Sequence, residues 1–169
     1  NDDFADEGAG LLTDQADSRI AYKLPADGSY LLRLGDTQRN GGPDYVYRLR
    51  VSHLQPDFEL RISPSSINAH AGSIVPITVH ALRVGGFSGD IAVRLKDAPK
   101  GFELSGAVVP GGQSQLRMTL SVPEGQGSRT SHLSLVGMAT IGSKQVERSS
   151  VPADDWMQAF FYHHLVTTT

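Results

Sequence analysis

The 169-residue chain contains no cysteine. It therefore forms no disulfide, offers no thiolate to zinc and has no cysteine nucleophile. No stretch approaches the ~18 consecutive apolar residues of a membrane span, so we expect no membrane insertion. The net charge is only −3 and the arginines are scattered singly, which argues against a nucleic-acid-binding protein with a clustered basic face.

Helix signals are scarce, whereas strand signals are dense. Near the N-terminus, apolar and polar residues alternate with a period of two, which is typical of strands with one face in water. This pattern predicts three antiparallel strands with the apolar positions Ile20, Tyr22, Leu24, Tyr30, Leu32, Leu34, Tyr45, Tyr47, Leu49 and Val51. A turn at residues 25–28 and a glycine-rich loop at 35–43 join them. Such a sheet needs a second layer to cover its apolar face.

A second series of strands follows a linker near Pro56. Turns with glycine or proline separate about seven short alternating runs, which is typical of an immunoglobulin-like sandwich. The sequence therefore predicts an all-β protein in three parts. These are a partial jelly-roll-like antiparallel sheet in residues 1–54, an immunoglobulin-like β-sandwich in 55–150, and an apolar C-terminal segment, 151–169, that packs on a sheet.

The C-terminal segment contains the stretch VPADDWMQAFFYHHLV. As a strand it is apolar on both faces, which implies burial on both sides or a partner. As a helix, it would begin at Asp154 or Asp155 and place Trp156, Phe160 and His163 on one face. We favour the strand. The predicted partner-binding residues are Trp156, Phe160, Phe161 and Tyr162.

Two stretches in the N-terminal part, DSRIAYKLPADGSYLLRL and GGPDYVYRLRV, resemble the C-terminal half of the bacterial pre-peptidase C-terminal domain. The ADG-x-Y turn and the GGP-x-Y-x-Y-R-L return strand carry the resemblance. It implies that the first half of that domain is absent from this chain. The sheet would then pack on the immunoglobulin-like domain, on the C-terminal segment or on a second copy of the chain.

The stretch PDFELRISPSSINAHAGSIVPITVHALRVGGFSGDIAVRLKDAPKGFEL resembles bacterial immunoglobulin-like domains that are appended to secreted hydrolases. The tandem resembles large exported proteins of planctomycete-type bacteria, where such modules are non-catalytic. The resemblance implies an extracellular, periplasmic or cell-surface location and a role as spacer, adhesion or substrate-docking module. The implied partners are other domains of the same parent protein and an extracellular polysaccharide or protein.

Calcium is the one cofactor for which the sequence offers candidate ligands, because acidic residues gather at the N-terminus and in the glycine-rich loop. Calcium takes about six to eight hard oxygen ligands, often from flexible loops. The predicted ligands are Asp2, Asp3, Asp36 and Asp44. Some domains of the resembled family are similar to calcium-binding modules, so the alternative function is calcium-dependent carbohydrate or collagen binding. The rival interpretation is that these carboxylates are only solvated.

No catalytic residue is predicted. Residues 86–90 approach the G-x-S-x-G nucleophile elbow around Ser88, but Asp90 stands where the second glycine belongs and strand patterns flank the turn. His163 and His164 are adjacent and would point to opposite faces of a strand. His80 and His132 could lie on facing strands, but we interpret them as solvent-facing polar positions. We therefore expect a non-enzyme; a part of a hydrolase is the lesser alternative.

Overall fold

The computed structural model describes residues 18–125, 130–158 and 162–168, and these residues form an all-β fold. They contain no helix, and so none that is long and apolar enough to cross a membrane. This confirms the predicted fold class. The nine strands are β1 (Asp57–Ser63), β2 (Ile74–Val84), β3 (Ile91–Lys96), β4 (Glu103–Ser105), β5 (Val108–Val109), β6 (Gln115–Ser121), β7 (Ser134–Ile141), β8 (Lys144–Gln158) and β9 (Tyr162–Thr167).

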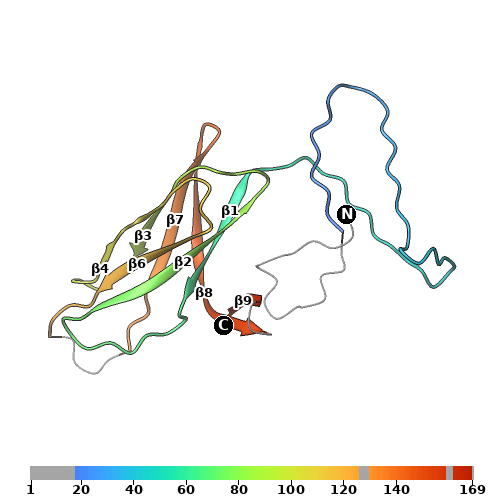
Figure 1. The fold of residues 1–169 in the computed structure, drawn as a ribbon. Helices are drawn as coiled ribbons and strands as arrows, with labels where there is room; N and C mark the ends of the chain where they lie inside the picture. Colours follow the sequence, from blue (N-terminus) through green and yellow to red (C-terminus); the bar gives the residue numbers. More distant parts are fainter. Residues whose placement is uncertain (1–17, 126–129, 159–161, 169) are drawn as a thin grey trace.

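The strands follow one path, β4-β6-β2-β1-β8-β7-β3-β5, which curls into two layers (Figure 1). One layer holds β4, β6, β2 and β1, and the other holds β8, β7, β3 and β5. The layers join where Leu60–Ile62 of β1 pairs in parallel with Ser150–Pro152 of β8; all other pairs are antiparallel. The strands are distributed between the layers as in an immunoglobulin-like sandwich.

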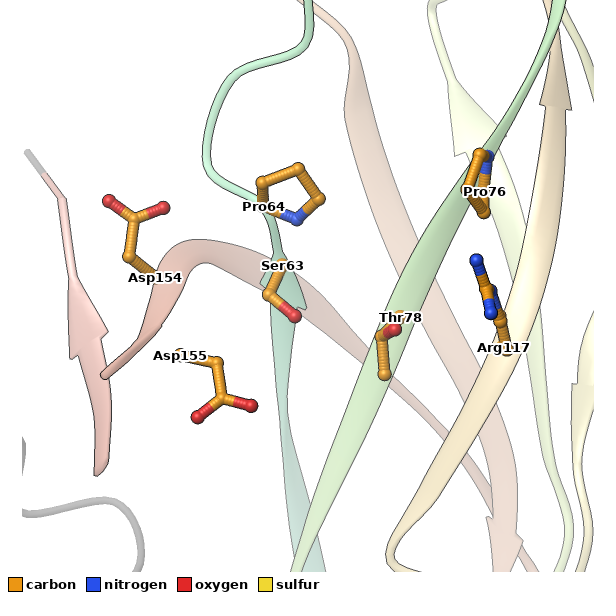
Figure 2. Close-up of a pocket in the computed structure, with 7 residues that line it drawn as sticks. All are labelled: Ser63, Pro64, Pro76, Thr78, Arg117, Asp154 and Asp155. Carbon is orange, nitrogen blue, oxygen red and sulfur yellow. The ribbon is translucent and has the colours of Figure 1, made fainter. Parts of the chain in front are cut away.

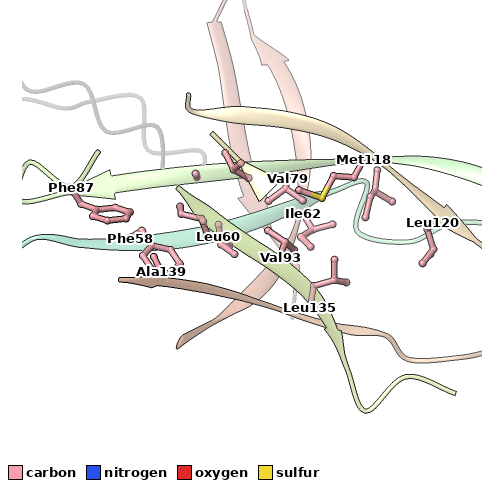
Figure 3. Packing of buried hydrophobic residues seen from close by; sticks show 14 residues of the cluster. Phe58, Leu60, Ile62, Val79, Phe87, Val93, Met118, Leu120, Leu135 and Ala139 are labelled. Atoms are coloured by element: carbon pink, nitrogen blue, oxygen red, sulfur yellow. The ribbon is translucent and has the colours of Figure 1, made fainter. Parts of the chain in front are cut away.

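The core lies between the layers because the central strands turn one row of apolar side chains inward. In β1, Phe58, Leu60 and Ile62 are buried, while the intervening Glu59 is exposed. The rings of Phe58 and Phe87 pack with centroids 5.6 Å apart. Figure 3 shows the cluster around them, which draws on both layers. The period-two pattern thus predicts correctly which side chains of β1 are buried.

The C-terminal segment forms a hairpin. β8 runs without interruption from its pairing with β7 into its pairing with β9, so the predicted domain boundary at 150 falls inside a strand. Residues 153–158 pair with residues 162–167, and Ala153 and Leu165 are buried. The strand prediction is therefore confirmed and the helical alternative is wrong. The reversal of the chain between β8 and β9 was not predicted.

The N-terminal residues 18–56, here called the arm, contain no strand, and every one of them is exposed. The prediction of a three-stranded, partial jelly-roll-like sheet is therefore wrong for the arm. Backbone hydrogen bonds within residues 20–54 close turns, from Arg39 N–H to Asp36 O (3.0 Å) and from Tyr45 N–H to Gly42 O (3.1 Å). Figure 1 shows the arm as a long, open loop beside the sandwich. An apolar face that no second layer covers gives the strands no reason to pair.

An ion pair fixes the point where the arm enters the sandwich. The Arg148 guanidinium donates two hydrogen bonds to Asp57, at 3.1 Å from Nε to Oδ1 and 2.7 Å from Nη2 to Oδ2. The Phe58 N–H also donates to Asp57 Oδ1, at 2.8 Å. Together these contacts, chiefly the hydrogen bond from Arg148, hold the pKa of Asp57 below its ordinary value of 3.8, although partial burial opposes them.

Substitution of Asp57 should therefore change the acid sensitivity of the fold. A depressed pKa in the folded state gives stability that is present above the unfolded pKa and is lost as the pH falls through the folded pKa. We expect Asp57→Asn to melt below the parent chain at pH 7 and the gap to close below about pH 4. Thermal melts between pH 7 and pH 3 measure this. A gap that stays constant over that range would contradict the assignment.

Candidate functional site

A groove of about 420 Å³ lies on the outer surface of the sandwich, where β1, β2, β6 and the bend of β8 meet (Figure 2). It lies on the outer surface because the floor residues alternate with core residues: Ser63 follows buried Ile62, and Thr78 lies between buried Ile77 and Val79. We call it the charged groove. Its lining consists of Ser63, Pro64, Pro76, Thr78, Arg117, Asp154 and Asp155.

The floor of the charged groove is one row of residues across three strands. Ser63 of β1 is paired with Thr78 of β2, and Thr78 is paired with Arg117 of β6. Because neighbouring strands lie about 4.8 Å apart, the backbones at the two ends of the row are about 10 Å apart. The rings of Pro64 and Pro76 lie along one side of this row (Figure 2).

The two ends of the charged groove carry opposite charges. Asp154 and Asp155 lie at the Ser63 end and Arg117 at the other (Figure 2). Asp154 Oδ1 accepts the Ser65 N–H at 3.1 Å, and Asp155 Oδ1 lies 2.9 Å from His163 Nδ1. The Arg117 side chain has no hydrogen bond or ion pair with any residue that the structure describes. The carboxylates are thus held in place, while the guanidinium is available.

A serine–histidine contact lies under the acidic end. Ser63 Oγ is 3.0 Å from His80 Nε2, and both residues are only 9% exposed. The interpretation of His80 as solvent-facing is therefore wrong. Sequence reasoning missed the contact because it depends on the β1–β2 register, which pairs Arg61 with His80 and so places Ser63 diagonally opposite. An antiparallel register with these polar residues on the outer face was the signal that could have revealed it.

This contact resembles half of a nucleophile–base pair, but its surroundings do not suit acyl transfer. Such a reaction needs hydrogen-bond donors aimed at a developing oxyanion. Beside Ser63 the charged groove instead presents the carboxylates of Asp154 and Asp155, which repel negative charge. The arrangement suits the binding of a charged ligand better than it suits hydrolysis. Ser88, the other serine considered, is exposed in the turn between β2 and β3.

The predicted calcium ligands are only partly placed. Asp36 Oδ2 accepts the backbone N–H groups of Gln38 (3.0 Å) and Asn40 (2.9 Å), which makes it a turn-stabilising residue. Asp44 is exposed in the same loop, and Asp2 and Asp3 lie outside the described residues. Within 18–125, 130–158 and 162–168, no three His, Asp or Glu residues gather as a metal would need. Calcium binding stays a prediction.

Two of the four predicted partner-binding aromatics lie in the strands of the C-terminal hairpin. Trp156 of β8 is 55% exposed and is paired with His164 of β9. Tyr162 is the first residue of β9, and Phe160 and Phe161 lie outside the described residues. Their role in partner binding stays a prediction. Comparison of the chain with models of protein families and with curated protein sequences finds no match.

Proposed function

We propose that the chain is a non-catalytic docking and spacer region of an exported or cell-surface bacterial protein. The observation that carries the proposal is the arm, a strand-patterned segment whose apolar side chains are exposed beside a well-packed sandwich. The proposed location rests on the resemblance to exported modules. Other domains of the parent protein, or an extracellular protein, are the partners that the arm would meet.

The arm exposes far more apolar surface than a monomeric protein usually does. Its ten apolar-face residues, named above as the apolar positions of the predicted strands, are each between 49% and 81% exposed. Two of its segments already approach one another without pairing, since Leu31, Leu32, Arg33, Leu34, Tyr47 and Leu49 line one open pocket of about 380 Å³. A partner that supplies a covering layer would give these segments the burial that they need in order to pair into a sheet.

The sandwich holds the end of the arm in a fixed position. Gly85, in the turn after β2, lies so close to the arm that a Cβ there would be 1.9 Å from the Gln55 carbonyl oxygen. The φ angle of Gly85 is +61°, which also favours glycine. The ion pair between Asp57 and Arg148 lies just after this contact. A partner docked on the arm would thus be held at a defined point of the sandwich, as a spacer requires.

The apolar face of the arm can be tested in purified protein, where a second copy of the chain is the first available partner. We expect the solution mass to rise above that of the monomer as the concentration increases, with slower amide exchange in residues 18–54. The double variant Leu32→Asp/Leu49→Asp should abolish both effects, because a charge on the apolar face opposes burial. Sedimentation and hydrogen-exchange mass spectrometry are the measurements.

The matched control places the same charges on the opposite face of the arm. Ser29 and Val46 are both exposed, do not line the open pocket, and each lies beside an apolar-face residue in the alternation. Ser29→Asp/Val46→Asp should leave self-association intact. If the parent chain stays monomeric at every concentration with unprotected arm amides, or if both double variants behave alike, the apolar face is not a docking element.

A further inference from the structure

We infer that the charged groove binds an extended peptide segment in which a basic and an acidic residue lie three positions apart. This inference goes beyond the docking role proposed for the arm and does not depend on it. It rests on the available oxygen atoms at one end of the charged groove, the guanidinium at the other, and the length of the floor between them.

The acidic end is prepared for a cation. Asp154 and Asp155 each use Oδ1 in a hydrogen bond within the protein, to Ser65 N–H and His163 Nδ1. The Oδ2 atoms of both have no hydrogen-bond partner among the described residues. Because the side chains are already held, a lysine or arginine of a ligand would gain charge-assisted hydrogen bonds without the cost of ordering two carboxylates.

The other end is prepared for an anion. Arg117 is exposed and unpaired in the described part of the chain, and a guanidinium matches a carboxylate with two parallel hydrogen bonds. A simple anion would be repelled by the two carboxylates at the far end, and a metal ion there would be repelled by Arg117. A ligand that carries both charges satisfies both ends at once.

The length of the floor sets the spacing of the two ligand charges. The row Ser63–Thr78–Arg117 spans about 10 Å between backbones, and a peptide in the extended polyproline II conformation advances about 3.1 Å per residue and returns to the same face every three residues. Side chains three positions apart therefore reach both ends. The exposed rings of Pro64 and Pro76 offer apolar contact to the stems of those side chains, and Thr78 contributes a partly exposed hydroxyl to the floor.

The probe for this site is a fluorescent peptide with an Arg-Ala-Ala-Glu core, whose termini are blocked so that they carry no charge. Fluorescence anisotropy at low salt should show saturable binding. Asp155→Asn and Arg117→Gln should each weaken it by about tenfold, the effect of one lost charge-assisted contact. A peptide with adjacent Arg and Glu presents the two side chains on different faces, so it should bind as weakly as these variants.

Two control variants remove one negative and one positive charge from outside the charged groove. Asp97→Asn and Lys144→Gln change exposed residues outside the charged groove, and both should bind like the parent chain. A charge reversal separates recognition from a folding defect. Arg117→Glu should lose the Arg-Ala-Ala-Glu peptide and gain an Arg-Ala-Ala-Arg peptide.

Several results would overturn the inference. They are an absence of saturable binding, equal losses in the control variants, and equal binding of the adjacent-charge peptide. Failure of Arg117→Glu to gain the dibasic peptide would count equally against it. Free arginine binding as tightly as the peptide would show that the acidic end acts alone as a small-cation site.

Discussion

Replacement of Phe58 by alanine is expected to lower the free energy of unfolding by about 3–5 kcal/mol. Phe58 is completely buried in β1 and its ring packs against that of Phe87. On the opposite layer its neighbour is Gly137, which has no side chain that could move into the vacated space. The variant should therefore retain a cavity and lose the corresponding free energy of unfolding, which urea unfolding followed by circular dichroism would measure.

The control for Phe58→Ala is Ile74→Ala, another large-to-small change in a strand. Ile74 is the first residue of β2 and is 68% exposed, so its loss should change the stability by less than about 0.5 kcal/mol. If the two variants were equally stable, Phe58 could not lie at the centre of the core.

Gly137→Val is expected to destabilise the sandwich by about 2–3 kcal/mol, for the opposite reason. A Cβ at Gly137 would lie 2.4 Å from Leu60 Cδ1, 2.9 Å from Ile91 Cγ2 and 3.1 Å from Phe58 Cε2. These side chains come from β1 in one layer and β3 in the other, so the added volume pushes the layers apart. Urea unfolding again provides the measurement.

Thr140→Val introduces the same side chain three residues further along β7, at an exposed position, and should leave the stability nearly unchanged. The double variant Phe58→Ala/Gly137→Val offers a sharper test. Because the new valine would fill part of the space that the phenyl ring leaves, the double variant should lose less stability than the two single variants together. Strict additivity would show that the two positions do not share one space.

The sequence pattern predicted well which residues of β1 are buried in the sandwich, because the alternation of inward and outward positions is a property of the strand's own sequence. Phe58, Leu60 and Ile62 are buried as their alternation indicates. The same alternation in the arm, at Tyr30, Leu32 and Leu34, led to a wrong prediction. A period of two specifies which side of a strand is apolar, but strands form only where another element covers that side.

The charged groove could not be predicted because its residues are distant in sequence. Ser63, Thr78 and Arg117 come together only through the registers of β1 with β2 and of β2 with β6. The acidic end depends further on the reversal of the chain after β8, which returns His163 to Asp155. Register is a property of the assembled sheet, and a shift by one residue would turn Thr78 inward.

The parallel pairing of β1 with β8 has a mechanical consequence. The arm enters at the start of β1, and the chain continues from the far end of β8. Tension that pulls these points apart would shear the two parallel strands. The backbone hydrogen bonds between them would then bear the load together instead of breaking one after another. Such an arrangement resists stretching, which suits the spacer role proposed above.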